Sequence, residues 1–189
     1  PTLTRGIMSP SPENPPSANA FADAENRHID MGEAKPLNTW LLNLGLTTDD
    51  VAFRVRRKKV LDGKIVAVEV FVLPTDVAEK FTVEELKNAH YVQMLGKFPE
   101  TAPHAMAYTV MAREARAVGA SFLEIAEGAP FLHTSYIYYN QEGRAVATGS
   151  ISYPAQQVEL RMHFALTGTH NAVEGVRGRD RTPPDAAYA

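Results

Sequence analysis

Two segments rich in β-branched residues, joined by a tight turn, constrain the fold of this chain most. Val51–Val60 and Ile65–Leu73 have the composition of β-strands, and they flank Leu61–Lys64, which contains the pair Asp62-Gly63. Such a pair favours the left-handed backbone of a tight hairpin turn. The sequence therefore predicts a β-hairpin, and with it a sheet whose neighbouring strands run antiparallel.

Further helices and strands are predicted around this hairpin. After Phe81, Thr82 and Glu85 form a capping box and Phe81 can pack on Leu86, so a helix should begin there. Apolar residues at helical spacing predict the other helices: Pro36–Leu44, Tyr91–Gly96 and Glu114–Leu123. Alternation predicts a strand over Ala105–Ala112, and turn signals before Phe131 and at Asn140–Arg144 predict two further strands joined as a hairpin, Phe131–Tyr139 and Ala145–Tyr153. A last strand is expected over Glu159–Phe164. This order indicates the α+β class, a mostly antiparallel sheet with helices packed on it.

The two ends of the chain differ from its middle. Residues 1–27 contain five prolines and three serines with little apolar periodicity, which predicts a disordered or extended linker. Residues 168–189 are similar, with several arginines and the pair Pro183-Pro184, and are expected to form a flexible tail. A single folded domain is therefore expected over residues 28–167.

Composition argues against several classes of function. A net charge of -3 and a pI near 6.1 mean that no overall positive field holds the chain on nucleic acid. The absence of cysteine excludes disulfides, thiolate metal sites and a cysteine nucleophile. No apolar stretch approaches the roughly 18 residues of a membrane span, and the N-terminus lacks a signal-peptide core. A cytoplasmic chain without membrane contact is expected.

The sequence also lacks the motifs of common enzymes and metal proteins. Its six histidines show no metal-ligand spacing, and no nucleophile elbow, P-loop or dinucleotide fingerprint is found. Residues 28–167 contain no helix-turn-helix signature. Glu69 by itself is not an acid–base pair. We therefore expect no metal, no cofactor and no catalytic residue.

A run of basic residues in the first hairpin strand points to a binding site. Five of the six residues from Arg54 to Lys59 are basic, and strand periodicity sorts them onto two faces. Arg57 and Lys59 follow Val55 on an apolar face, whereas Arg56 lies on the other. Cations on such a face must be paired, reach the rim of the sheet, or hold an anion. A solvated strand end and an anion site remain equally open at this point.

The register of the hairpin decides whether Glu69 joins these cations. A two-residue Asp62-Gly63 turn would pair Glu69 with Arg56, on the opposite face. A three-residue Leu61–Gly63 loop would place Glu69 opposite Val55 and beside Arg57. We favour the three-residue loop, which makes a cluster of Arg57, Lys59 and Glu69.

This cluster would lie on an otherwise apolar face with Phe53, Ile65 and Phe71. Apolar walls with a few converging polar groups are typical of a small-molecule site. Four tyrosines could add hydroxyls and flat walls, although such residues more often cap a core: Tyr136, Tyr138, Tyr139 and Tyr153. Removal of the Arg57 cation when no anion is bound should relieve its repulsion with Lys59, so replacement of Arg57 by alanine is expected to leave the melting temperature about unchanged.

Several strings in this order resemble the UTRA domain, the effector-binding domain of GntR-type regulators of the HutC branch, which shares the chorismate lyase fold. The resemblance covers about Glu33–Leu166. Its strings are Leu44-Gly45-Leu46, the Arg57–Gly63 hairpin segment, Glu69 with Leu73-Pro74, Glu127–Pro130 and Glu142–Arg144. It implies a chorismate lyase-like α+β fold.

The resemblance also implies a set of ligand-binding residues. Basic residues at Arg57 and Lys59 hold an anionic group, Glu69 lines the cavity and Tyr153 closes it. Tyr91 stands where the family often starts a helix with leucine and tyrosine after a serine, and this chain has Ala89-His90 before it. The chain departs from the family pattern at three further positions, Ala147, Pro154 and Gln156. These departures argue against a sugar phosphate as the ligand but leave a small anionic metabolite.

The function implied is that of a ligand sensor in a transcription regulator. Such a domain pairs into a homodimer, and DNA is bound through a winged-helix domain that we expect to be absent from this chain. The alternative is a chorismate lyase-like enzyme, in which Arg57 would grip a substrate carboxylate. A third possibility is an interaction domain with a collapsed pocket.

Overall fold

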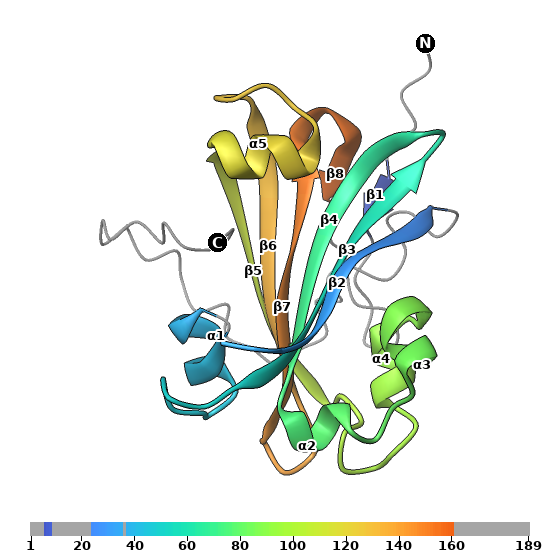
Figure 1. Ribbon diagram of the computed structural model, residues 1–189, viewed down its shortest axis with the longest axis vertical. Coiled ribbons are helices and arrows are strands. Elements are labelled where there is room, and N and C mark those ends of the chain that lie inside the picture. The colour runs from blue at the N-terminus through green and yellow to red at the C-terminus, as the bar shows by residue number, and fades with distance from the viewer. Residues whose placement is uncertain (1–5, 9–23, 36, 161–189) are drawn as a thin grey trace, which may run out of the picture.

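The structure, a computed structural model, describes residues 6–8, 24–35 and 37–160. Its centre is one six-stranded antiparallel sheet (Figure 1). In spatial order the strands are β2 (Glu25–Ala34), β3 (Ala52–Leu61), β4 (Lys64–Leu73), β7 (Ala145–Pro154), β6 (Pro130–Tyr139) and β5 (Ala105–Glu114). A separate parallel pair joins β1 (Gly6–Met8) to β8 (Val158–Leu160). The predicted α+β class with a mostly antiparallel sheet is confirmed.

Short helices cover both faces of the six-stranded sheet (Figure 1). They are α1 (Asn38–Asn43), α2 (Thr75–Ala78), α3 (Val83–Asn88), α4 (Tyr91–Leu95) and α5 (Ala117–Leu123). In β4, Phe71 and Leu73 pack under α2, α3 and α4, on what we call the α3–α4 face. Val70 and Val72 pack under α1, and Val68 packs under α5, on the α1–α5 face. Because β4 is covered on both sides, its sequence is a nearly continuous apolar run.

The predicted hairpin forms, but its turn is shorter than predicted. Leu61 pairs with Lys64, so Asp62 and Gly63 are the two turn residues. Their φ angles are 51° and 75°, the left-handed values that a two-residue hairpin turn needs. The prediction of a three-residue loop was therefore wrong.

A β-bulge in β4 sets the register that the turn alone would not give. Val66 is an extra residue in β4, and both Val66 and Ala67 pack on the α3–α4 face. Beyond the bulge Glu69 lies directly opposite Arg57, so neither of the two simple registers holds. Glu69 shares the face of Arg57, as predicted, whereas Ile65 packs on the α1–α5 face and is not part of this cluster.

Local signals located most of the other elements, but β1, β2 and α2 were not predicted. The capping box at the start of α3 is present, with Thr82 and Glu85 bonded reciprocally. Strand β2 was not predicted, because its ten residues are mostly polar and carry no apolar alternation. It begins at Glu25, before the expected domain start at His28, and Gly6–Met8 is a strand within the expected linker. The predicted tail, residues 168–189, lies outside the described residues.

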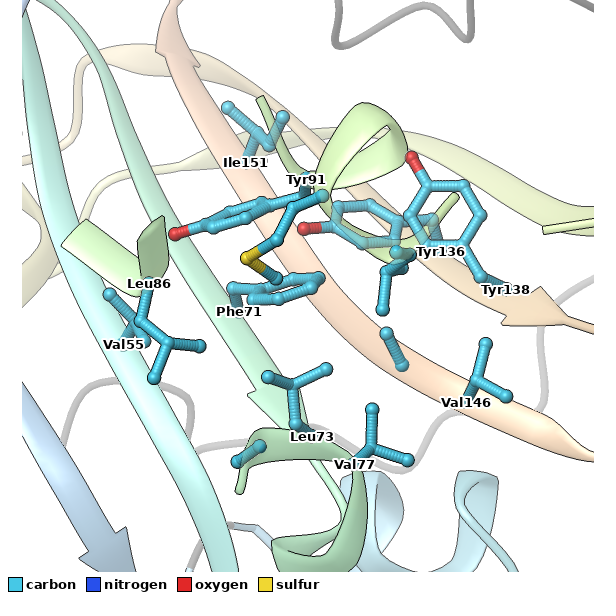
Figure 2. Packing of buried hydrophobic residues seen from close by; sticks show 14 of the residues in the cluster. Val55, Phe71, Leu73, Val77, Leu86, Tyr91, Tyr136, Tyr138, Val146 and Ile151 are labelled. Atoms are coloured by element: carbon cyan, nitrogen blue, oxygen red, sulfur yellow. The ribbon is translucent and has the colours of Figure 1, made fainter. Parts of the chain in front are cut away.

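The core under α2, α3 and α4 is aromatic as well as aliphatic (Figure 2). The rings of Phe71 and Tyr91 are stacked, with centroids 3.6 Å apart and 6° between their planes. Tyr136 and Tyr138 pack in the same cluster, with ring centroids 5.1 Å apart. Tyr139 packs on the α1–α5 face instead, so the group of tyrosines noted in the sequence is divided between the two faces.

The position of Tyr136 depends on a glycine in the neighbouring strand. Gly149 lies between Phe71 and Tyr136 in the register, and a Cβ atom there would lie 2.7 Å from Tyr136 Oη and still closer to the Val70 carbonyl oxygen. Gly149→Ala should therefore lower the free energy of unfolding by about 1–3 kcal/mol, since the backbone of a central strand cannot yield freely. Urea unfolding measures the loss. Ser150→Ala, at the next position on the other face, should cost at most about 1 kcal/mol; an equal loss in both variants would contradict this reason.

Candidate functional site

A small pocket opens on the α3–α4 face where β3 and β4 meet the start of α4. Seven residues line it: Arg57, Lys59, Glu69, His90, Tyr91, Val92 and Tyr138. Its cavity volume is about 20 Å³, which is room for about one water molecule. Four of the five predicted binding residues therefore lie around one pocket.

Arg57 and Glu69 form a buried ion pair at the base of this pocket. Arg57 Nε donates to Glu69 Oε2 at 2.6 Å, and each residue is 3% exposed. Burial alone raises the pKa of Glu69, but the charges of Arg57 and Lys59 outweigh burial and hold this pKa below its usual range. Burial alone lowers the pKa of Arg57, and Glu69 more than offsets that effect. Both groups are thus charged at neutral pH. Arg57 has a buried ionic partner without any ligand, so the repulsion from Lys59, on which the expected unchanged melting temperature rested, is not the main interaction of Arg57.

Arg57 also fastens the segment between α3 and α4 to the sheet. Its Nη1 donates to the carbonyl oxygens of Lys87 at 3.3 Å and Ala89 at 3.2 Å. Its guanidinium carbon lies 4.1 Å from the centroid of the Tyr91 ring. Since Phe71 covers one face of that ring, the guanidinium lies over the other face. One side chain of β3 therefore holds both the end of α3 and the start of α4.

Lys59 differs from Arg57 because its charge has no close partner. Its ammonium forms no ion pair or hydrogen bond with any residue that the structure describes, although Lys59 is partly buried and lines the pocket. Burial lowers the pKa of Lys59, Glu69 acts against this, and Arg57 lowers the pKa further. An anion placed beside this ammonium would relieve the cost of burying it.

Two buried phenol groups near the ion pair also lack partners. The hydroxyls of Tyr91 and Tyr136 form no hydrogen bond within the described part of the chain, and the residues are 5% and 2% exposed. Glu69 and Arg57 both act on the pKa of each tyrosine, so the two rings lie close to the ion pair; burial, the largest cause, raises both pKa values. Buried hydroxyls without partners cost about 1–3 kcal/mol each. A polar ligand or a water molecule in this region would supply the missing hydrogen-bond partners.

The structure does not bring every predicted residue to the pocket. Tyr153 lies on β7 in the same core cluster, 1% exposed, but does not line the pocket. His90 and Val92, which do line it, were not predicted as ligand contacts. Tyr91 reaches the pocket because Ala89 and His90 have extended backbone and turn the chain between the two short helices α3 and α4. Two features of the sequence indicated this segment: the helix predicted over Tyr91–Gly96 and the departure of Ala89-His90 from the family pattern.

The described residues show no other feature that indicates chemistry. No cluster of three or more histidine, aspartate or glutamate side chains within them could hold a metal ion. No helix among them has the length and apolar character needed to cross a membrane. The pocket at Arg57, Lys59 and Glu69 is therefore the candidate functional site.

Solved structures share this fold. A GntR-family transcriptional regulator from Enterococcus faecalis has a TM-score of 0.66 at 21% identity, over 74% of this chain and 100% of that one. PhnF from Mycobacterium smegmatis has a TM-score of 0.69 at 14% identity, over 86% and 73%. A protein from Bordetella bronchiseptica, described as the ligand-binding domain of a GntR-family regulator, has a TM-score of 0.60 at 19% identity, over 69% and 82%. At these identities the likeness establishes the fold.

The sequence itself carries the family assignment. None of the curated proteins matches it. The family model of the UTRA domain matches residues 22–159, which include all strands of the six-stranded sheet and the whole pocket. The resemblance noted in the sequence is confirmed, and this chain belongs to the UTRA domain family.

Proposed function

We propose that this UTRA domain is the effector-sensing part of a GntR-type transcription regulator, and that its pocket binds a small anionic metabolite. The observation that carries the proposal is the partly buried Lys59 ammonium in the pocket, which no described residue pairs. Arg57 and Glu69 neutralise each other at 2.6 Å, so Lys59 is the uncompensated charge of the cluster. The hydroxyls of Tyr91 and Tyr136 support a ligand that also carries hydrogen-bonding groups.

Binding of a metabolite requires the pocket to enlarge. A cavity volume of about 20 Å³ does not admit a small organic molecule, whose sites usually measure about 300 Å³ or more. The wall that we expect to move is the segment from Lys87 to Tyr91, because its contacts with the sheet run through Arg57, the side chain that a bound anion would attract. An anion that attracts the Arg57 guanidinium competes with the carbonyl oxygens of Lys87 and Ala89. Ligand affinity and the position of this segment are then coupled, which is the requirement for a sensor.

Lys59→Met tests the anion site. Thermal-shift screening of small carboxylates and phosphate esters identifies a binder, and calorimetry then measures its affinity for each variant. We expect Lys59→Met to weaken binding about ten- to a hundredfold, the effect of one charge-assisted hydrogen bond. The matched control is Lys58→Met, because Lys58 is the neighbouring residue, lies on the other face and pairs with Glu124 at 3.3 Å. Equal affinities for Lys59→Met and wild type would contradict the proposal.

Chorismate should be included in the same screen, since the alternative function for a domain of this fold is that of a chorismate lyase-like enzyme. Release of 4-hydroxybenzoate, followed by its absorbance, would overturn the assignment of a sensor. In the proposed role the domain works in the cytoplasm, pairs with a second copy, and leaves DNA contact to a winged-helix domain.

A further inference from the structure

Among the described residues that line the pocket, His90 is the one histidine. It lies directly before α4, where the extended backbone turns the chain into that helix. The protonated form of a histidine, which in water predominates below about pH 6.5, offers an anion a positive charge and two N–H donors. His90 is therefore a candidate second contact for an anion beside Lys59.

The size of the cavity brings the two side chains within reach of one ligand group. Lys59 lines it from β3 and His90 lines it from the start of α4, on the opposite side of the fold. Its volume is about 20 Å³, which is room for about one water molecule. A single anionic group in this space contacts both walls, since no room is left between them.

The groups around the His90 imidazole determine when it takes up a proton. They are the cations Arg57 and Lys59 of β3, the carboxylate of Glu69 on β4, and the phenols of Tyr91 on α4 and Tyr138 on β6. Burial acts most on the pKa of Glu69, followed by Arg57 and Lys59, and His90 also lowers this pKa, so a charge on His90 is felt within the cluster. Because Arg57 and Glu69 neutralise each other, the charge of Lys59 disfavours a further cation at His90.

We propose that an anion bound beside Lys59 also contacts His90, and that His90 takes up a proton when the anion binds. The inference rests on the anion site proposed above and names a second residue of that site. An anion beside the imidazole favours its protonated form and offsets the repulsion from Lys59. The ligand then faces two positive charges instead of one. Since proton uptake and anion binding favour each other, the affinity for the anion rises as the pH falls from 8 to 6.

Sulfate is a suitable probe of this coupling, because its charge does not change between pH 6 and 8 and a compact ion requires little enlargement of the pocket. Titrations followed by NMR at constant ionic strength give its affinity at both pH values. We expect wild type to bind sulfate about fivefold or more tightly at pH 6 than at pH 8, the gain for a histidine whose pKa rises by about one unit on binding. His90→Gln keeps a hydrogen-bonding side chain but cannot titrate, so it should lose most of this gain.

The matched control is His104→Gln, which removes an exposed histidine outside the pocket and should keep the full gain. Burial lowers the pKa of His133 to about 4, so this residue stays neutral over the range of the experiment. The pKa of Lys59 is also lowered, and any titration of Lys59 near pH 8 is common to wild type and His90→Gln. The difference between these two proteins therefore isolates His90. Circular dichroism checks that each variant is folded.

Lys59→Met separates this inference from the anion site itself. Loss of sulfate binding in Lys59→Met, together with a gain at pH 6 that depends on His90, supports both. Loss of binding in Lys59→Met with equal gains in wild type and His90→Gln overturns the proton-linked contact and leaves the anion site. Sulfate binding that does not depend on Lys59 overturns both. If wild type binds no sulfate at either pH, the proton-linked contact is overturned, and the metabolite screen decides on the anion site by itself.

Discussion

Replacing Arg57 with alanine should lower the free energy of unfolding by about 3–5 kcal/mol. The substitution leaves the Glu69 carboxylate, 3% exposed, without the guanidinium that neutralises it, and an uncompensated buried charge costs about that much. It also releases the carbonyl oxygens of Lys87 and Ala89 and uncovers one face of the Tyr91 ring. Urea unfolding at neutral pH measures the effect.

Arg56→Ala is the matched control for this prediction. Arg56 is the preceding residue and has the same charge, but it lies on the other face and pairs with Asp30 near the surface. Its loss should cost at most about 1 kcal/mol. The double variant Arg57→Met with Glu69→Met should recover most of the stability, because no buried charge of that pair remains. A loss below 1 kcal/mol for Arg57→Ala would show that the ion pair does not stabilise the fold.

Mild acid should destabilise the domain through one buried histidine. His133 of β6 is 6% exposed, and its Nδ1 shares a hydrogen bond of 3.0 Å with Ser152 Oγ. Burial, aided by the charge of Arg113, lowers the pKa of His133 to about 4 from an ordinary value of 6.5. The unfolded chain therefore takes up a proton below pH 6.5 that the folded chain refuses until about pH 4. Stability is fully present above pH 6.5 and is lost as the pH falls through this window.

The size of this loss follows from the shift in pKa. One pKa unit corresponds to about 1.4 kcal/mol, so roughly 3 kcal/mol is lost in total and about 2 kcal/mol of it by pH 5. Urea unfolding at pH 7, 6 and 5 measures it. His133→Gln keeps a hydrogen-bonding side chain but removes the titrating group, so the difference between the two proteins isolates this residue from other histidines. Equal slopes of stability against pH in wild type and His133→Gln would refute the assignment.

Much of the fold followed from local patterns. The hairpin strands, the capping box of α3 and the alternation of β5 through β7 are set by neighbouring residues, and all were predicted. Strand β2 was missed because its stability comes from pairing with β3 rather than from an apolar pattern of its own. An edge strand of this kind leaves little local signal.

The candidate site was predicted in composition but not in geometry. Strand periodicity placed Arg57 and Lys59 on one face, the favoured hairpin register added Glu69, and the UTRA resemblance added Tyr91. Neither source located the bulge at Val66, which brings Glu69 directly opposite Arg57. A bulge depends on how two strands pack beneath the helices that cover them, and the sequence of either strand alone does not determine this packing.

Sequence by itself determined which residue types lie on which face of β3, because alternation follows from the backbone geometry of any strand. It also determined the family, because the order and spacing of many weak strings persist along the chain. The tertiary structure decided what each charge does: Arg57 is satisfied by Glu69 and by two carbonyl oxygens, while Lys59 is left without a partner among the described residues. The reason is that partners more than ten residues away in sequence are chosen by packing between elements. Two adjacent positions on one face can therefore hold identical charges, one that is paired within the fold and one that we propose binds the ligand.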